Sequence, residues 1–446
     1  MTAFRLPVLP PRHPHDREIL RLAVPAFGAL VAEPLFLLAD SAIVGNLGTP
    51  QLAGLAIAAT VLATAVHLCI FLAYGTTAAV ARSLGAGDLR GALRLGIDGL
   101  WLALLLGVFL GVIGIVSASF VSGWFTDDSA VAGYSTTYLR ISMFGLPGML
   151  GVLAMTGILR GLQDTATPLK VAVAANLGNV LLDYVLVYPL GMGIGGSALA
   201  TIIAQWLSLA VYMAVVLKAV RLEGVSLALS WTGVTRSFRA SSPLLIRNLS
   251  MRTVVIVSTA VAARIGSPEL AAHQVAFTVW TTLSLGLDAV AIAGQAIIGR
   301  LLGAADAVGA RAAVRRMVEL SIGLGVVLGL LIFAGRDLIP PIFSADPEVR
   351  RLLSDALLII ALVQPVAGWV FALDGILIGA GDNRYIAAAQ AVTVAVFVPL
   401  AIGVLVFDLG LTGLWWALAG WLLVRFVLML RRQLSGTWAV EGATRP

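Results

Sequence analysis

Long apolar runs, separated by short polar turns, make up almost the whole chain. About twelve runs of roughly 20 to 30 residues follow one another, and Gly, Pro, Asp and Arg recur in the turns between them. Because roughly 20 apolar residues span the hydrocarbon core of a bilayer, each run is predicted to be a transmembrane helix. The predicted helices are 19–45, 53–81, 93–118, 131–158, 167–189, 194–220, 238–263, 269–299, 312–335, 348–376, 384–406 and 411–433. The pattern predicts an all-α polytopic membrane protein with twelve transmembrane helices.

The second half of the chain repeats the first at a shift of about 218 residues. The matched pairs include Pro25 with Pro243, Arg82 with Arg300, Gly85 with Gly303, Asp88 with Asp306, and Gly161 with Gly379. Such self-similarity indicates two copies of one structural unit. We therefore expect two six-helix lobes, 19–220 and 238–433, joined by a linker at 221–237. A six-helix unit begins and ends on the same side, so the lobes should be related by a pseudo-two-fold axis along the membrane normal.

Composition and charge agree with a membrane protein. Hydrophobic residues make up 59% of the chain and charged residues only 12%, which leaves no room for a large soluble domain. On the predicted topology, 21 Lys and Arg residues fall on the side of the N-terminus and four on the other side. This asymmetry places both termini in the cytoplasm. The net charge of +6 is therefore a topological signal, and it does not indicate nucleic-acid binding.

The two ends of the chain are expected to be tails outside the lobes. Residues 1–18 are polar and rich in Pro, without the apolar segment and cleavage site of a signal peptide, so we expect a poorly ordered cytoplasmic tail. Residues 434–446 form the C-terminal tail. The single cysteine, Cys69, lies within an apolar run and excludes a disulfide within the chain.

Two acidic residues interrupt the first apolar run. Glu33 and Asp40 are seven residues apart, nearly two helical turns, so they should point to roughly the same side. An ionisable group at membrane depth is costly and usually functional, which indicates a proton or cation site. The alternative is that Asp40 only bonds a neighbouring helix. Pro25 and Pro34 weaken this helix, and we hypothesise that protonation of Asp40 changes its bend.

The fifth predicted helix carries a polar face. Asn176, Asn179 and Asp183 occur at i, i+3 and i+7, and Thr201 and Gln205 lie one turn apart on the sixth helix. Asp40 and Asp183 should lie at similar depth in the outer half of the same bundle. Two carboxyl groups in one dry pocket should share one proton near neutral pH. A packing network without a transport role remains the alternative.

Both acids are absent from the second copy, where Ser258 and Ala401 replace Asp40 and Asp183. We therefore expect the two lobes to differ in function.

The second lobe carries its own buried-looking acids. Asp288 and Asp374 lie nearer the inner surface, and Asp374 is expected to be partly solvated; either a structural or a functional role fits both residues. The seventh helix carries Arg247 and Arg252 but no acid, which argues against a cation site there. No residues show metal-ligand spacing, and no phosphate-binding loop is present, so an ion gradient is the expected energy source.

Several stretches together resemble the multidrug and toxic compound extrusion (MATE) transporters, and within them the DinF-like branch. They are LADSAIVGNLGTPQLAGLAIA (38–58), ARSLGAGD, ILRGLQDTATPL, NLGNVLLDYVLVYPLGMGIGGSALAT (176–201), LAAHQVAF, LDAVAIAGQAIIG and ILIGAGDNR. The resemblance covers about 18–432. It implies twelve helices in two lobes and export of organic, often cationic and aromatic, compounds in exchange for H+ or Na+.

The resemblance also assigns residues. It places the proton-coupling and substrate pocket at Asp40, Asn179, Asp183 and Thr201. At Glu33 and Leu37, relatives often have uncharged polar or aromatic residues, so the substrate preference of relatives does not transfer to this chain.

The acid that accompanies Na+ coupling in the NorM branch is absent from the seventh helix. H+ is therefore favoured, although the first-lobe acids could hold Na+. No organic cofactor or metal is expected.

Three functions follow as hypotheses. The first is a proton-coupled exporter of small organic compounds, monomeric, in the inner membrane of a bacterium. The second is a flippase for a lipid-linked intermediate, which would need a large cationic cavity for phosphates. The third is an intramembrane aspartyl enzyme that uses Asp40 and Asp183, against which the repeat and the missing catalytic motif argue.

Overall fold

The computed structural model describes residues 14–444, which fold into helices and short connections. The first lobe contains α1 (Asp16–Gly45), α2 (Thr49–Cys69), α3 (Phe71–Gly85), α4 (Leu89–Phe125), α5 (Ser129–Ser142), the 3-10 turn η1 (Met143–Gly145), α6 (Leu146–Gly161), α7 (Ala166–Val187) and α8 (Gly193–Leu222). The second lobe contains α9 (Trp231–Ile265), α10 (Ser267–Gly303), α11 (Ala307–Gly335), α12 (Pro340–Phe343), α13 (Pro347–Gly379), α14 (Asn383–Val406) and α15 (Gly410–Ser435).

Twelve helical spans in residues 14–444 are long and apolar enough to cross a membrane. Two of them are interrupted: α2 and α3 form one span with a break at Ile70, and α5, η1 and α6 form another. These spans confirm the predicted fold class.

The helices extend beyond the predicted boundaries. The seventh helix begins at Trp231 rather than at 238, because Ser230 caps it by accepting a hydrogen bond from the Gly233 amide. The non-helical linker is therefore 223–230, shorter than the predicted 221–237. The first helix begins at Asp16, within the predicted tail of 1–18. The expectation of a poorly ordered tail falls mainly on residues 1–13, which lie outside the described residues.

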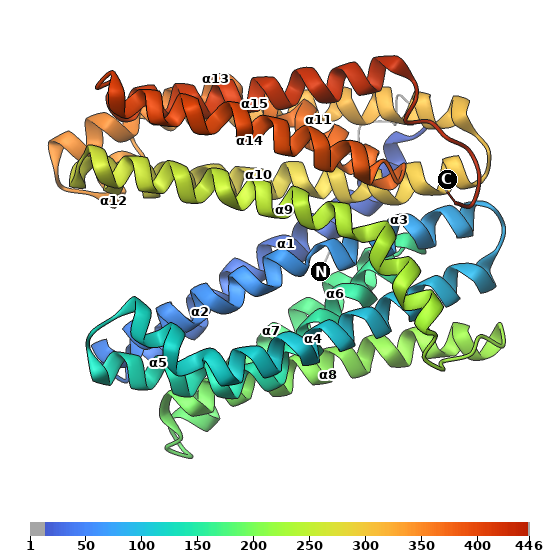
Figure 1. Cartoon of the computed structure of the whole chain (residues 1–446), viewed down its shortest axis with the longest axis horizontal. Coiled ribbons are helices and arrows are strands. Elements are labelled where there is room, and N and C mark those ends of the chain that lie inside the picture. Colours follow the sequence, from blue (N-terminus) through green and yellow to red (C-terminus); the bar gives the residue numbers. More distant parts are fainter. Residues whose placement is uncertain (1–13, 445–446) are drawn as a thin grey trace, which may run out of the picture.

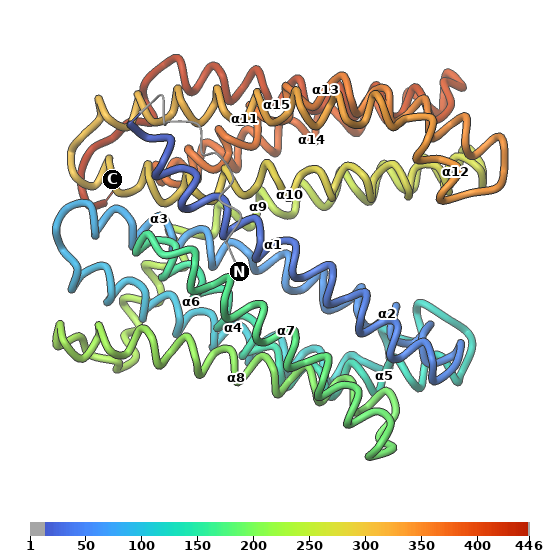
Figure 2. The backbone as a smooth tube through the Cα atoms, turned by 180° about the vertical axis from the view of Figure 1, so that it is seen from behind, coloured from blue at the N-terminus to red at the C-terminus, as the bar shows by residue number. Residues whose placement is uncertain are grey.

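The two lobes meet at one end of the molecule and diverge toward the other (Figure 1). The start of α1 and the chain after α15 lie at the end where they meet, which we call the junction end; Figure 2 shows the same arrangement from behind. Across the junction, α3 and α1 of the first lobe both pack against α10 of the second lobe. Where α1 meets α10, Ala26 of α1 joins a small apolar cluster with Ala289 and Ile292 of α10.

Equivalent segments of α3 and α10 contact each other at the junction. A Cβ atom on Gly85 would collide with the carbonyl oxygen of Arg300, and a Cβ atom on Gly303 would collide with that of Arg82. Glycine is therefore needed at both positions for α3 and α10 to approach closely. Because Gly85 and Gly303 are equivalent in the repeat, the pseudo-two-fold axis passes between these two helices.

The turn after each of these glycines ends in a helix cap. Asp88 accepts a hydrogen bond from the Gly91 amide at the start of α4, at 2.7 Å, and Asp306 does the same for Gly309 at the start of α11. Such caps satisfy amide groups that have no partner within their own helix.

The segment after α15 crosses the junction. The guanidinium group of Arg82, in α3, donates to the carbonyl oxygens of Ala380, Val440 and Gly442 at 2.7–3.1 Å. Gly442 in turn donates to Leu302 of α10 at 2.9 Å. We call 436–442 the C-terminal strap. It joins the first lobe to the second at the junction end.

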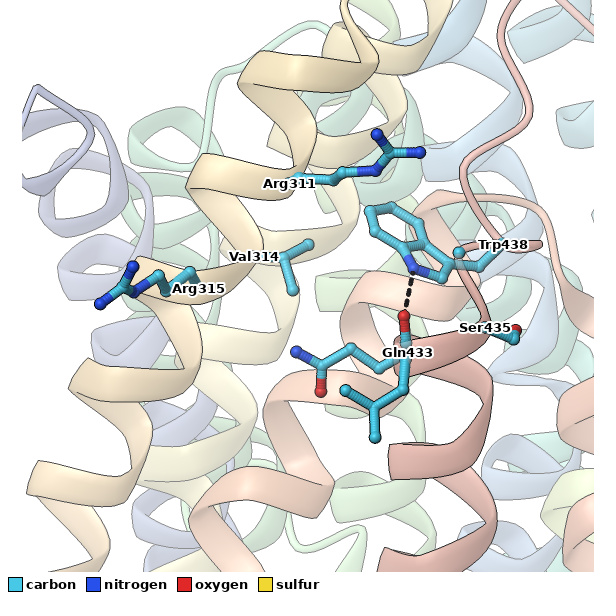
Figure 3. Close-up of a pocket in the computed structure, with 8 residues that line it drawn as sticks. Arg311, Val314, Arg315, Gln433, Ser435 and Trp438 are labelled. Atoms are coloured by element: carbon cyan, nitrogen blue, oxygen red, sulfur yellow. Dashed lines mark hydrogen bonds between the residues drawn. The ribbon is translucent and has the colours of Figure 1, made fainter.

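A buried tryptophan anchors the strap. The Trp438 side chain is 2% exposed, and its indole nitrogen donates to the carbonyl oxygen of Gln433 at 3.2 Å. Figure 3 shows this contact beside a hollow lined by Arg311, Val314 and Arg315 of α11. The hollow lies at the surface of the second lobe, away from the acidic pair described below.

Candidate functional site

Two carboxyl groups lie side by side inside the first lobe. Asp40 in α1 is 5% exposed and Asp183 in α7 is fully buried, and their side chains adjoin each other and the hydroxyl of Ser197 in α8. Ser197 donates to Asp40 Oδ1 at 2.7 Å. Neither oxygen of Asp183 accepts a hydrogen bond from the described residues. No described Lys, Arg or His lies within ion-pair distance of either acid.

This arrangement favours a shared proton. Two ionised carboxylates in contact repel each other, and burial makes each charge costly. A proton on Asp183 would remove that repulsion and give it a hydrogen to donate to Asp40. The pair can therefore hold or release one proton as a unit.

Polar side chains from three helices surround the pair. Asn179 in α7 is buried and lies 3.5 Å from the hydroxyl of Thr201 in α8, to which its amide nitrogen donates. Tyr138 in α5 is 4% exposed and lies beside Asp40, Ser197 and Thr201. The site thus brings together α1, α5, α7 and α8, all from the first lobe.

The other residues that the sequence suggested for the pocket are less buried than the two acids. Glu33 and Leu37 are exposed, so the expectation that Glu33 and Asp40 share one side does not place them in one buried pocket. Asn176 is half-buried and donates to the carbonyl oxygen of Ala32 at 3.0 Å, which fixes α7 against α1. Gln205 is half-buried and makes no hydrogen bond among the described residues.

Sequence reasoning missed Ser197 and Tyr138. Ser197 lies four residues before Thr201, so the helical period placed both hydroxyls on one face of the sixth predicted helix. Tyr138 gave no such signal, because its proximity to Asp40 depends on the packing of helices that are distant in sequence.

The acids of the second lobe differ from each other. Asp374 in α13 pairs with Arg247 of α9 and lies 3.2 Å from a guanidinium nitrogen of Arg425 in α15. It is 5% exposed, so the prediction that it is partly solvated is wrong: α10, α11 and α15 pack around α13 and cover it. Asp288 in α10 is half-buried, with no hydrogen bond or ion pair among residues 14–444.

Arg425 was not singled out from the sequence. It is a lone arginine in the apolar run of the last helix and is 1% exposed. An ionisable residue at this depth is by itself a signal of function or of a buried ion pair. Within residues 14–444, no group of three or more His, Cys, Asp or Glu side chains could hold a metal ion.

Comparison with known proteins identifies the family. The model of the MatE family matches residues 25–185 and 243–402. The chain belongs to the MATE family. The two matched segments begin 218 residues apart, which is the shift of the internal repeat. Members of the MATE family are efflux transporters for drugs and toxic compounds and are not enzymes, so the aspartyl-enzyme hypothesis is set aside.

Relatives from a plant and a bacterium are similar over nearly the whole chain. The Arabidopsis thaliana protein DETOXIFICATION 44, chloroplastic, is 30% identical over 96% of this chain and 83% of its own. The Escherichia coli (strain K12) DNA damage-inducible protein F is 30% identical over 95% of this chain and 94% of its own.

A solved structure shares the fold. The Vibrio cholerae MATE transporter VcmN in the bent form has a TM-score of 0.84, with 20% identity over 95% of this chain and 96% of its own. At this level of identity the likeness establishes the two-lobe fold of the present MATE protein.

Proposed function

We propose that this MATE protein exports organic compounds, cationic or amphipathic, in exchange for H+, and that Asp40 and Asp183 carry the proton. The observation that carries the proposal is the pair of adjoining buried carboxyl groups without a fixed cation. Burial of such a pair is costly unless a proton or a bound cation offsets its negative charge. Substrate and proton can then compete for one site.

The second lobe has no comparable site. The acid that is buried within a span, Asp374, already has two guanidinium partners, Arg247 and Arg425. A coupling cation would have to displace both of them. We therefore assign coupling to the first lobe, and the substrate contacts nearest the acids to Asn179 and Thr201.

We place the protein as a monomer in the cytoplasmic membrane of a bacterium, with both termini in the cytoplasm. The excess of Lys and Arg on the side of the N-terminus supports this orientation. On this orientation the junction end faces the cytoplasm, and the lobes diverge toward the outside.

Proton release tests the proposal. Purified protein in weakly buffered detergent solution is mixed with a cationic rhodamine dye, and the released protons are followed with a pH indicator. We expect release from the wild type and none from Asp40→Asn. Asp408→Asn is the matched control, because Asp408 lies in the exposed turn between α14 and α15 and should release as the wild type does.

Two results would contradict proton coupling. One is the absence of proton release by the wild type, whereas equal release by the wild type and Asp40→Asn would contradict the assignment of the proton to Asp40. The other is dye binding without proton release that instead displaces Na+, which would assign the same carboxyl pair to sodium coupling.

A further inference from the structure

Arginine side chains outnumber acids where the two lobes face each other. Three arginines lie within spans there, and a fourth, Arg425, lies inside the second lobe beside one of their acidic partners; two acids interact with these arginines. The arginines are Arg160, Arg247, Arg252 and Arg425, and the acids are Asp288 and Asp374. The proposed exchange of H+ through the first lobe uses none of these six residues.

Arg252 lies on the boundary without an acidic partner. It is half-buried in α9 of the second lobe, and it donates to the hydroxyl of Thr64 in α2 of the first lobe at 2.9 Å. No described carboxylate lies within ion-pair distance of it. Among the described residues, its guanidinium group therefore donates to a neutral hydroxyl and has no carboxylate partner.

Arg247 continues the boundary one and a half turns along α9. Its guanidinium group lies over the ring of Tyr74 in α3, 5.6 Å from the ring centre. The neighbouring Asn248 donates to the carbonyl oxygens of His67 and Leu68 at 3.3 and 3.4 Å, where α2 ends. Although Arg247 pairs with Asp374, its Nε atom is buried without an acceptor.

Arg160 is the least satisfied of the four. It lies in α6 of the first lobe, is 9% exposed, and makes no hydrogen bond or ion pair within residues 14–444. Tyr74, Tyr212 and Asp288 lie near enough to interact with it electrostatically, and none of the three forms a hydrogen bond or ion pair with it. A buried charge without a partner costs several kcal/mol.

The three arginines follow one another along the boundary. Thr64 and the end of α2 contact Arg252 and Asn248, Tyr74 lies under Arg247, and Arg160 interacts with the same Tyr74. We call Arg252, Arg247 and Arg160 the arginine row. Guanidinium groups with free N–H donors are the groups that proteins use to bind carboxylates.

We propose that the arginine row binds an anionic oxygen group, such as a carboxylate, on the compound that this transporter exports. The exported compound is then amphipathic and carries a carboxylate as well as, or instead of, a positive charge. This inference rests on the proposed export function and names the class of its substrate. It also gives Arg160 and Arg252 the partners that the protein itself does not supply.

A pair of dyes that differ in one group tests the inference. Rhodamine 110 has a free carboxylate, and rhodamine 123 is its methyl ester. Binding of each to the purified protein in neutral detergent at pH 7 is measured by fluorescence anisotropy. We expect the wild type to bind rhodamine 110 about tenfold more tightly, which corresponds to one charge-assisted hydrogen bond.

Variants of one helix provide the controls. In Arg252→Gln the ratio of the affinities for rhodamine 110 and rhodamine 123 should fall toward one. Arg252→Lys, which retains the charge, should keep part of the preference for rhodamine 110. Arg264→Gln makes the same substitution at an exposed position near the end of α9 and should bind both dyes as the wild type does. Asp40→Asn should retain the preference, because the carboxyl pair does not contact the row.

Several outcomes would overturn the inference. One is equal affinity of the wild type for the two dyes. Another is an equal loss of affinity for both dyes in Arg252→Gln. Displacement of rhodamine 110 by phosphatidylglycerol but not by soluble 2-naphthoate would assign the row to lipid phosphates instead. A wild type that binds neither dye would contradict the export proposal together with the inference, whereas rhodamine 123 bound preferentially would contradict the inference alone.

Discussion

Gly85 and Gly303 allow the two lobes to pack closely because neither residue has a side chain. Each is the repeat equivalent of the other, and each lies against the backbone carbonyl of an arginine in the opposite lobe, Arg300 for Gly85 and Arg82 for Gly303. A side chain at either position would force α3 and α10 apart at the junction end. The closed junction of this state therefore depends on two hydrogens in place of two methyl groups.

We expect Gly303→Ala to destabilise the junction by about 1–3 kcal/mol, the usual cost of overpacking. The thermal midpoint of the purified protein, read from size-exclusion peaks in detergent, should fall. Gly323→Ala is the control, because Gly323 is helical in α11 and its Cβ would meet nothing within 4 Å. Equal midpoints for the two variants would show that the helices separate without cost.

The hydropathy pattern predicted all twelve spans because the bilayer imposes one length on every helix. It could not predict their ends. The first turns of α9, from Trp231, contain Arg236 and Arg239 and lie beyond the apolar run, so only the Ser230 cap marks the true start. Helices that extend past the membrane are invisible to a pattern that measures apolar length.

The candidate site was likewise predictable from the sequence only in part. The spacing of Asn179 and Asp183 on one helix was sufficient to place them together, since helical geometry is local. The partners of Asp374 were not predictable, because Arg247 and Arg425 come from helices that are distant in sequence and meet it only in the folded lobe. The exposure of Glu33 likewise depends on which helices pack around α1.

Ser197 should tune the proton site without carrying the proton. Ser197→Ala removes the hydroxyl that donates to Asp40, a bond to a charged group worth roughly 1.5–3 kcal/mol. We expect proton-driven dye export from loaded vesicles to fall by roughly tenfold or more. Ser208→Ala is the control, since Ser208 is also buried in α8 but donates only to its own helix, at Ala204. Similar losses in both variants would refute a specific role for Ser197.

The C-terminal strap should stabilise the contact between the lobes. Truncation after Ser435 removes the acceptors of Arg82 at Val440 and Gly442 and the buried ring of Trp438. We expect a lower thermal midpoint, because loss of a buried Trp alone costs about 3–5 kcal/mol. Truncation after Gly442 keeps every one of these contacts and should leave the midpoint unchanged. If both truncations behave alike, the strap does not hold the junction.

Asp374 and Asp288 provide a matched pair of acids in one lobe. Asp374→Asn leaves Arg247 and Arg425 buried without their shared counterion, and breaking a buried pair in this way costs about 3–5 kcal/mol. Asp288→Asn breaks no ion pair within the described chain, so its effect on stability should be small. Thermal midpoints in detergent separate the two expectations. Asp374 neutralises part of the positive charge beside the arginine row. If Asp288→Asn were the less stable variant, then Asp288, and not Asp374, would be the counterion that this lobe requires.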